Sequence, residues 1–102
     1  MPTIEEALYH LGYDYTDAAI LSNVTRSLRA ADSYLRGAVG QDIWQLLPYD
    51  DQARELVLIY LDDLCSERGT SAKAGAAKRE MVHSMELQLR LRLNMAREAA
   101  QV

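Results

Sequence analysis

Apolar residues recur at intervals of three and four along most of the chain, which is the spacing of one face of an α-helix. The longest such series begins near Asp17 and ends near Arg36. Its apolar members are Ile20, Leu21, Val24, Leu28, Ala31 and Leu35. The spacing predicts a long helix here, with Thr16 as the better N-cap candidate and with Gly37 and Gly40 ending the helix.

Two signals predict a short first helix near the N-terminus. Thr3 is followed three residues later by Glu6, a capping-box pair in which each side chain bonds the backbone N–H of the other residue. Gly12 follows Leu11 at the place where such a helix is expected to stop. The apolar side of this helix consists of Ile4, Ala7, Leu8 and Leu11.

The run Leu56–Leu61 is apolar around almost the whole circumference of a helix, which is typical of the most buried helix of a bundle. A β-strand is the competing interpretation of so short a run. The helix formers before it, Gln52–Glu55, favour the helix. We therefore expect a central helix that begins at Asp50 or Asp51 and ends at about Arg68, before a glycine.

Between the second and third predicted helices, the segment Gln41–Tyr49 is compact and apolar, and Pro48 closes it. Trp44 in this segment has two interpretations. It either fills the gap between the two helices, which its apolar neighbours favour, or anchors a subunit interface together with Tyr49. The sequence leaves both interpretations open.

The segment Gly69–Ala76 is small and polar, and it predicts a flexible loop. Helical spacing resumes near Ala77, and we favour a helix to about Arg92 with a frayed end. From Leu87 to Leu93, however, leucines alternate strictly with polar residues, so a strand remains the alternative there. Residues 89–102 then form either the end of a helix or an extended docking tail.

Together these elements predict an all-α fold, a small bundle of about four helices around a long central apolar helix. A chain of 102 residues supports one domain, here residues 1–102, that buries roughly two-thirds of its unfolded surface. Hydrophobic and charged contents of 49% and 25% are ordinary for a soluble globular protein. The leucines near the C-terminus leave an apolar edge that favours assembly with other subunits over catalysis.

Charge is distributed unevenly along the chain, whose net charge is −4. Residues 1–68 hold 5 basic and 12 acidic side chains, whereas residues 69–102 hold 6 basic and 3 acidic ones. An acidic body with a basic tail favours head-to-tail association between copies, because opposite ends attract each other. The acidic body argues against a nucleic-acid-binding domain, which usually needs a basic face.

The N-terminus lacks the basic start and the apolar run of a secretion signal. The longest strictly apolar run, Leu56–Leu61, is far too short to span a bilayer. Cys65 is the only cysteine, so it has no partner for a disulfide within the chain, and we expect it to be a small core residue. These features predict a soluble protein of a reducing, intracellular environment.

The candidate catalytic or metal-binding residues are few. Glu80 and His83 have the i,i+3 spacing of carboxylate-bridged metal bundles, but such sites need a second copy of the motif. His10 lies at a helix end without an identifiable catalytic partner, and Asp62 and Asp63 are interpreted as a solvated acidic face. We therefore expect no enzymatic activity and no cofactor.

The basic residues Lys73, Lys78 and Arg79 suggest an alternative function, a small DNA-binding protein that uses residues 69–92. Three charges in this segment provide only a weak, salt-sensitive attraction to phosphates. A recognition helix here would also have few base-reading residues. This alternative is therefore the less favoured one.

Four features carry a resemblance to a known family. They are the short opening helix, the alanine-rich segment Ser27–Gly37, which contains a tyrosine and ends in glycine, the end of the apolar third helix at Ser66–Gly69, and the segment Glu86–Arg90, which contains a Gln-Leu-Arg triplet. The layout resembles the small head–tail connector (head-completion or adaptor) proteins of tailed bacteriophages, once grouped as the QLRG family of possible DNA-packaging proteins. Leu91 stands here where that family has glycine.

The resemblance implies a helical protomer that assembles into a ring, commonly of twelve copies, at the neck of the virion after synthesis in the host cytoplasm. The ring would dock on the portal protein, extend the DNA channel without reading a nucleic-acid sequence, and present a surface to the next neck or tail component. The C-terminal segment would reach the portal. The portal-docking candidates on this basis are Leu89, Arg90, Leu91, Arg92 and Leu93.

Overall fold

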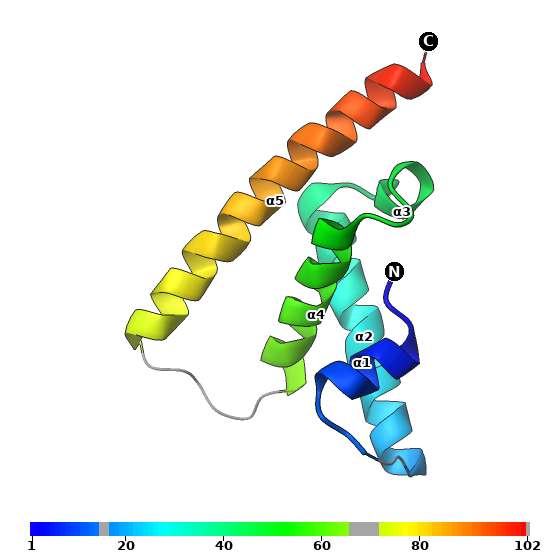
Figure 1. Ribbon diagram of the computed structural model, residues 1–102, viewed down its shortest axis with the longest axis vertical. Helices are drawn as coiled ribbons and strands as arrows, with labels where there is room; N and C mark the ends of the chain where they lie inside the picture. The colour runs from blue at the N-terminus through cyan, green and yellow to red at the C-terminus, as the bar shows by residue number, and fades with distance from the viewer. Residues whose placement is uncertain (15–16, 66–71, 102) are drawn as a thin grey trace.

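The protein is all-α, as the periodicity predicts. The computed structural model describes residues 1–14, 17–65 and 72–101, which contain helices and no strand. The helices are α1 (Ile4–His10), α2 (Ala18–Val39), α3 (Ile43–Leu46), α4 (Asp51–Cys65) and α5 (Ala72–Ala100) (Figure 1). The predicted number of helices is close to the observed one, because α3 is a single turn within the segment expected to be compact.

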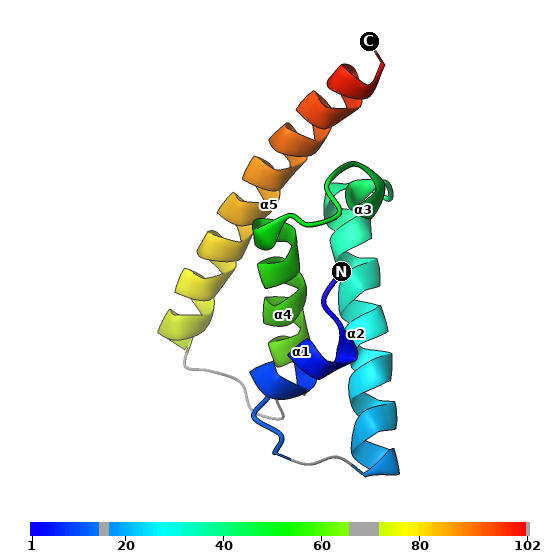
Figure 2. The same ribbon diagram turned by 45° about the vertical axis from the view of Figure 1, so that its right-hand side comes forward.

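Helix α4 is the central helix of the bundle. It packs along α2, and it also contacts α1 and α5 (Figures 1 and 2). Its buried residues lie on several sides of the helix: Ala53, Leu56, Val57, Ile59, Tyr60 and Leu61. The prediction of a helix that is apolar around most of its circumference is confirmed.

Helix α1 begins with the predicted capping box. The Thr3 hydroxyl accepts a hydrogen bond from the Glu6 N–H at 3.1 Å, and the Glu6 carboxylate accepts one from the Thr3 N–H at 3.4 Å. Gly12 follows the helix with φ +84°, a left-handed conformation that glycine adopts without steric cost. Glu6 also forms an ion pair with Arg54, which ties α1 to α4.

Both ends of α2 differ from the prediction. The N-cap is Asp17, whose carboxylate accepts a hydrogen bond from the Ile20 N–H at 2.8 Å, and Thr16 lies outside the described residues. Gly37 lies inside the helix, which continues to Val39 before Gly40 ends it. A glycine inside a helix lowers its stability by only about 0.5–1 kcal/mol relative to alanine. The tertiary contacts of the following turn stabilise the helix by more than this, so Gly37 does not end it.

Helix α4 begins where the acidic pair predicts. Asp50 is the residue before the helix, and its carboxylate accepts a hydrogen bond from the Ala53 N–H at 3.0 Å. The predicted end near Arg68 lies outside the described residues. Cys65 is exposed and not a core residue, because it is the last residue of α4 and the buried residues of that helix end at Leu61.

Helix α5 is longer at both ends than the sequence predicts. It begins at Ala72, so residues 72–76 are helical and not a loop, while residues 69–71 lie outside the described part. It continues past Arg92 to Ala100. The strand alternative for residues 87–93 and the extended tail over residues 89–100 are therefore wrong.

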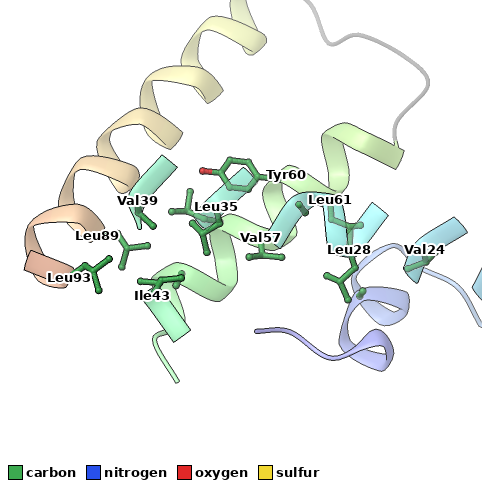
Figure 3. Close-up of a cluster of buried hydrophobic side chains, with 14 residues drawn as sticks. Val24, Leu28, Leu35, Val39, Ile43, Val57, Tyr60, Leu61, Leu89 and Leu93 are labelled. Atoms are coloured by element: carbon green, nitrogen blue, oxygen red, sulfur yellow. The ribbon is translucent and has the colours of Figure 1, made fainter. Parts of the chain in front are cut away.

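The hydrophobic core runs along the contact between α2 and α4 and reaches α5 at one end. Figure 3 shows Leu89 and Leu93 of α5 beside Val39 and Ile43, at the end of the bundle where α2 passes into α3. Leu89, Leu93 and Ile43 have no exposed surface. The C-terminal half of α5 is thus attached to the bundle through the junction between α2 and α3.

Candidate docking surface on α5

Helix α5 carries apolar residues on two opposite faces. Leu89 and Leu93 on its inner face are 0% exposed. Leu87, Leu91 and Met95, which we call the outer stripe, are 43%, 65% and 67% exposed. The residues of each set are four positions apart, so each set lies on one side of the helix, one turn after another. The alternation in the sequence therefore reflects a helix with two apolar sides.

This arrangement divides the five residues predicted to dock on a portal. Leu89 and Leu93 belong to the core of their own chain and are not available to a partner in this fold, so their assignment as docking residues is corrected. Leu91 lies on the outer stripe and is exposed. Leu87 and Met95 were missed, because the sequence does not show which of the two apolar faces of α5 is turned toward the bundle.

The arginines between these leucines contact the bundle. Arg90 donates from Nε to the Ala38 carbonyl at 2.7 Å, at the end of α2. Arg92 forms an ion pair with Asp50 and donates from Nη2 to the Gln52 side chain at 2.6 Å. Both residues therefore fasten α5 to its own chain.

Two further ion pairs lie toward the ends of α5. Arg97 binds Asp42 through two hydrogen bonds of 2.8 and 2.6 Å, and Lys78 lies 2.9 Å from the Asp63 carboxylate. Together with Arg92–Asp50 we call these contacts the three α5 ion pairs. They join the basic part of the sequence to the acidic part within one molecule. The opposite charges of the body and the tail, which suggested association between copies, thus pair within one chain at these three places.

The ion pairs shift the pKa values of the groups they join. The hydrogen bonds from Arg97 hold the pKa of Asp42 below its ordinary value, and those from Arg92 do the same for Asp50. Tyr60 of α4 donates a hydrogen bond from Oη to the Glu86 carboxylate of α5 at 2.6 Å. The pKa of Tyr60 is raised, mainly by burial and also by this hydrogen bond. Asp42 and Asp50 therefore remain ionised at a lower pH than an ordinary aspartate does.

This leads to an expected pH dependence of stability. Because the pKa values of Asp42 and Asp50 are lowered on folding, their ion pairs stabilise the protein above the ordinary carboxyl pKa of 3.8. That contribution is lost as the pH falls through the lowered values. We expect the Tm, measured by circular dichroism, to fall on acidification from about pH 4 downward. In Asp42→Asn the fall should be shallower, and an unchanged slope would contradict this account.

The two residues predicted as a subunit interface have different environments. Trp44 is half-buried against the core, and its Nε1 donates to Asp32 at 2.5 Å. Asp32 is only 6% exposed and also lies 3.1 Å from Arg36 Nε, without hydrogen-bond geometry. The indole therefore has a partner in its own chain, which favours the core interpretation. Tyr49 is 86% exposed and its ring is open to solvent.

The residues considered for catalysis or metal binding lie in solvated positions. His10 Nε2 lies 2.9 Å from Asp62, a contact between α1 and α4 that the sequence does not reveal. Glu80 and His83 are both exposed on α5. Within residues 1–14, 17–65 and 72–101, no three His, Cys, Asp or Glu side chains come together as metal ligands would, and no helix there is long and apolar enough to cross a membrane.

Comparison of the chain with protein-family models, with curated proteins and with solved structures finds no match. The basis for a functional proposal is therefore the structure itself, above all the two faces of α5.

Proposed function

We propose that this protein is a structural adaptor that works by binding neighbouring subunits, of the kind found at the head–tail junction of tailed phages and prophages. The observation that carries the proposal is the outer stripe of α5. A single exposed leucine on a protein surface is ordinary. Apolar residues on three turns of one helix face, outside a helix whose opposite face already fills the core, are typical of a docking surface.

The charges beside the outer stripe indicate the kind of surface that it suits. Glu80 and Glu98 are exposed and lie on the same side of α5 as Leu87 and Leu91, because about two helical turns separate Glu80 from Leu87 and Leu91 from Glu98. Two parallel outer stripes would place each glutamate opposite its own copy, which is unfavourable. A different protein surface, apolar in the middle and basic at its ends, suits the stripe better.

The resemblance to connector proteins supplies the identity of such a partner. In the proposed assembly, copies of the chain form a ring in the virion neck, and α5 docks on the portal through Leu87, Leu91 and Met95. Tyr49 is the remaining exposed candidate for a contact between subunits. The ring extends the DNA channel toward the next neck or tail component, and the role is non-catalytic.

The test is binding to the portal protein encoded in the same genome. The chain is mixed with assembled portal and analysed by size-exclusion chromatography with light scattering. The double variant Leu91→Ser, Met95→Ser is expected to lose at least tenfold in portal affinity and to keep its helical content, because both side chains are mostly exposed. Leu21→Ser, at an exposed leucine of α2, is the matched control and should bind normally. If the wild-type chain does not co-elute with the portal, the proposal is refuted.

The alternative of a DNA-binding protein using residues 69–92 is less well supported. Lys78 and Arg92, two of the basic side chains in that range, already form ion pairs with carboxylates of their own chain. Binding to phosphates would have to compete with those contacts. A gel shift of duplex DNA at low ionic strength that disappears with salt would favour this alternative.

A further inference from the structure

The apolar core is largely built without α5. All but two of the buried apolar side chains in the described part of the chain lie between residues 2 and 61, and α5 adds Leu89 and Leu93. Most of these residues lie where α2 packs along α4 (Figure 3). Helices α1 to α4 therefore have an apolar core of their own, and α5 covers one end of it.

Beyond Leu89 and Leu93, the partly buried Val82 and Met85 of α5 also pack against the core, and several polar contacts add to the attachment. The three α5 ion pairs lie between Lys78 and Arg97, a distance of roughly 28 Å along the helix at 1.5 Å per residue. Arg90, Glu86 and Gln88 add hydrogen bonds to Ala38, Tyr60 and Gln52 respectively. Both views show α5 as a separate rod beside the bundle, with its C-terminal end beyond α3 (Figures 1 and 2).

We infer that α5 is an exchangeable helix: the surface of α2, α3 and α4 that it covers in its own chain also receives the α5 of a second copy, through the same ion pairs. Each of these contacts joins α5 to the rest of the bundle. An exchanged pair of chains therefore reproduces every one of them. The inference does not depend on the proposed function, since it concerns two copies of this chain alone.

Charge complementarity identifies the occupant. The α5 side of the contact presents Lys78, Arg92 and Arg97, and the bundle side presents Asp63, Asp50 and Asp42. A bundle surface with three carboxylates at these positions attracts an α5 and repels a second bundle. The two leucines of the inner face then enter the same apolar surface beside Ile43 and Val39.

The pair Asp42–Arg97 allows the sharpest test. Asp42 precedes α3 but makes no capping hydrogen bond to it, so its replacement removes no helix cap. Asp50, by contrast, caps α4 through the Ala53 N–H and is unsuitable. Asp42→Arg and Arg97→Asp are made in separate chains. In each variant alone, residues 42 and 97 carry like charges, which face each other when α5 packs on the bundle of its own chain.

Mixing the two variants restores both contacts only in an exchanged pair. The arginine at position 42 of one chain meets the aspartate at position 97 of the other, and the reciprocal contact is the native Asp42–Arg97 pair. With one variant carrying a size tag, native mass spectrometry is expected to show mixed dimers at least tenfold more abundant than dimers of either variant alone. The double variant Asp42→Arg, Arg97→Asp restores the contact within one chain and should form no more dimer than the wild type.

A mixture that behaves as the sum of its two components, with no mixed dimer, would overturn the inference. Circular dichroism shows whether each variant keeps its helices. Should either variant be unfolded, the wild-type chain is labelled at the exposed Cys65 with donor or acceptor dyes, and the two preparations are mixed at raised ionic strength. Exchange predicts energy transfer that develops faster at higher salt, because salt weakens the ion pairs that hold each α5 on its own bundle and so speeds its release. A lack of transfer at every salt concentration would equally refute it.

Discussion

Replacing Leu93 by alanine is expected to lower the free energy of unfolding by about 2–5 kcal/mol, the range for removing a fully buried leucine side chain. Leu93 is 0% exposed although it lies on a helix at the edge of the bundle. Its side chain lies beside Ile43 at the junction of α2 and α3 (Figure 3). The loss combines the burial free energy of the removed methyl groups with the cost of the cavity left between α5 and this junction.

The matched control for this variant is Leu91→Ala, two residues earlier on the same helix. Leu91 is 65% exposed, so its truncation should change stability by no more than about 0.5 kcal/mol. Urea denaturation followed by the fluorescence of Trp44, the single tryptophan, measures both variants. Equal losses would mean that the inner and outer faces of α5 are assigned wrongly. The comparison thus tests the division of the leucines between core and docking surface.

Replacing Gly40 by alanine is expected to be similarly damaging, by at least about 2 kcal/mol, since a strained backbone and an overpacked contact each cost roughly 1–3 kcal/mol. Gly40 ends α2 with φ +154°, a conformation that side chains disfavour. A Cβ there would also meet the Arg97 guanidinium and would lie 2.6 Å from Leu93 Cδ2. The added methyl group would push α5 away from the bundle at the point where its ion pair with Asp42 forms.

Gly37→Ala is the control for this effect. Gly37 lies inside α2, and a Cβ there meets nothing within 4 Å. Alanine is the better helix former, so this variant should gain about 0.5–1 kcal/mol. Thermal unfolding followed by circular dichroism gives both values. A neutral Gly40→Ala would show that α5 does not approach the end of α2 as closely as the contact with Leu93 requires.

Much of the secondary structure could be predicted from local chemistry. The capping box at Thr3 and Glu6 and the start of α4 at Asp50 or Asp51 rest on signals within a few residues, and both are confirmed. Helix ends that depend on distant contacts were predicted less well. Helix α2 runs through Gly37, because its last turn packs Val39 into the core. Helix α5 runs past Arg92, where Arg97 binds Asp42 of a distant segment.

The candidate site was predicted in part. The C-terminal leucines were recognised as a surplus of apolar surface, and Leu91 is indeed exposed. Leu89 and Leu93 were assigned to a partner although they complete the core. The basic tail was interpreted as a contact for another copy, which stays a prediction, and the pair that Arg97 forms with Asp42 of the same chain was not foreseen. Arg97 and Asp42 are 55 residues apart in the sequence, so no local pattern predicts that they pair.

The sequence by itself determined the helical class, the central position of α4 and the presence of two sets of leucines near the C-terminus, because spacing and capping act between neighbouring residues. Only the tertiary structure decided which set is buried. In a helix with apolar residues on opposite sides, both orientations satisfy the same periodicity. The orientation depends on the surface that α2, α3 and α4 present to α5. Leu89 and Leu93 pack on its apolar part beside Ile43, and the carboxylates of Asp42 and Asp50 bind Arg97 and Arg92.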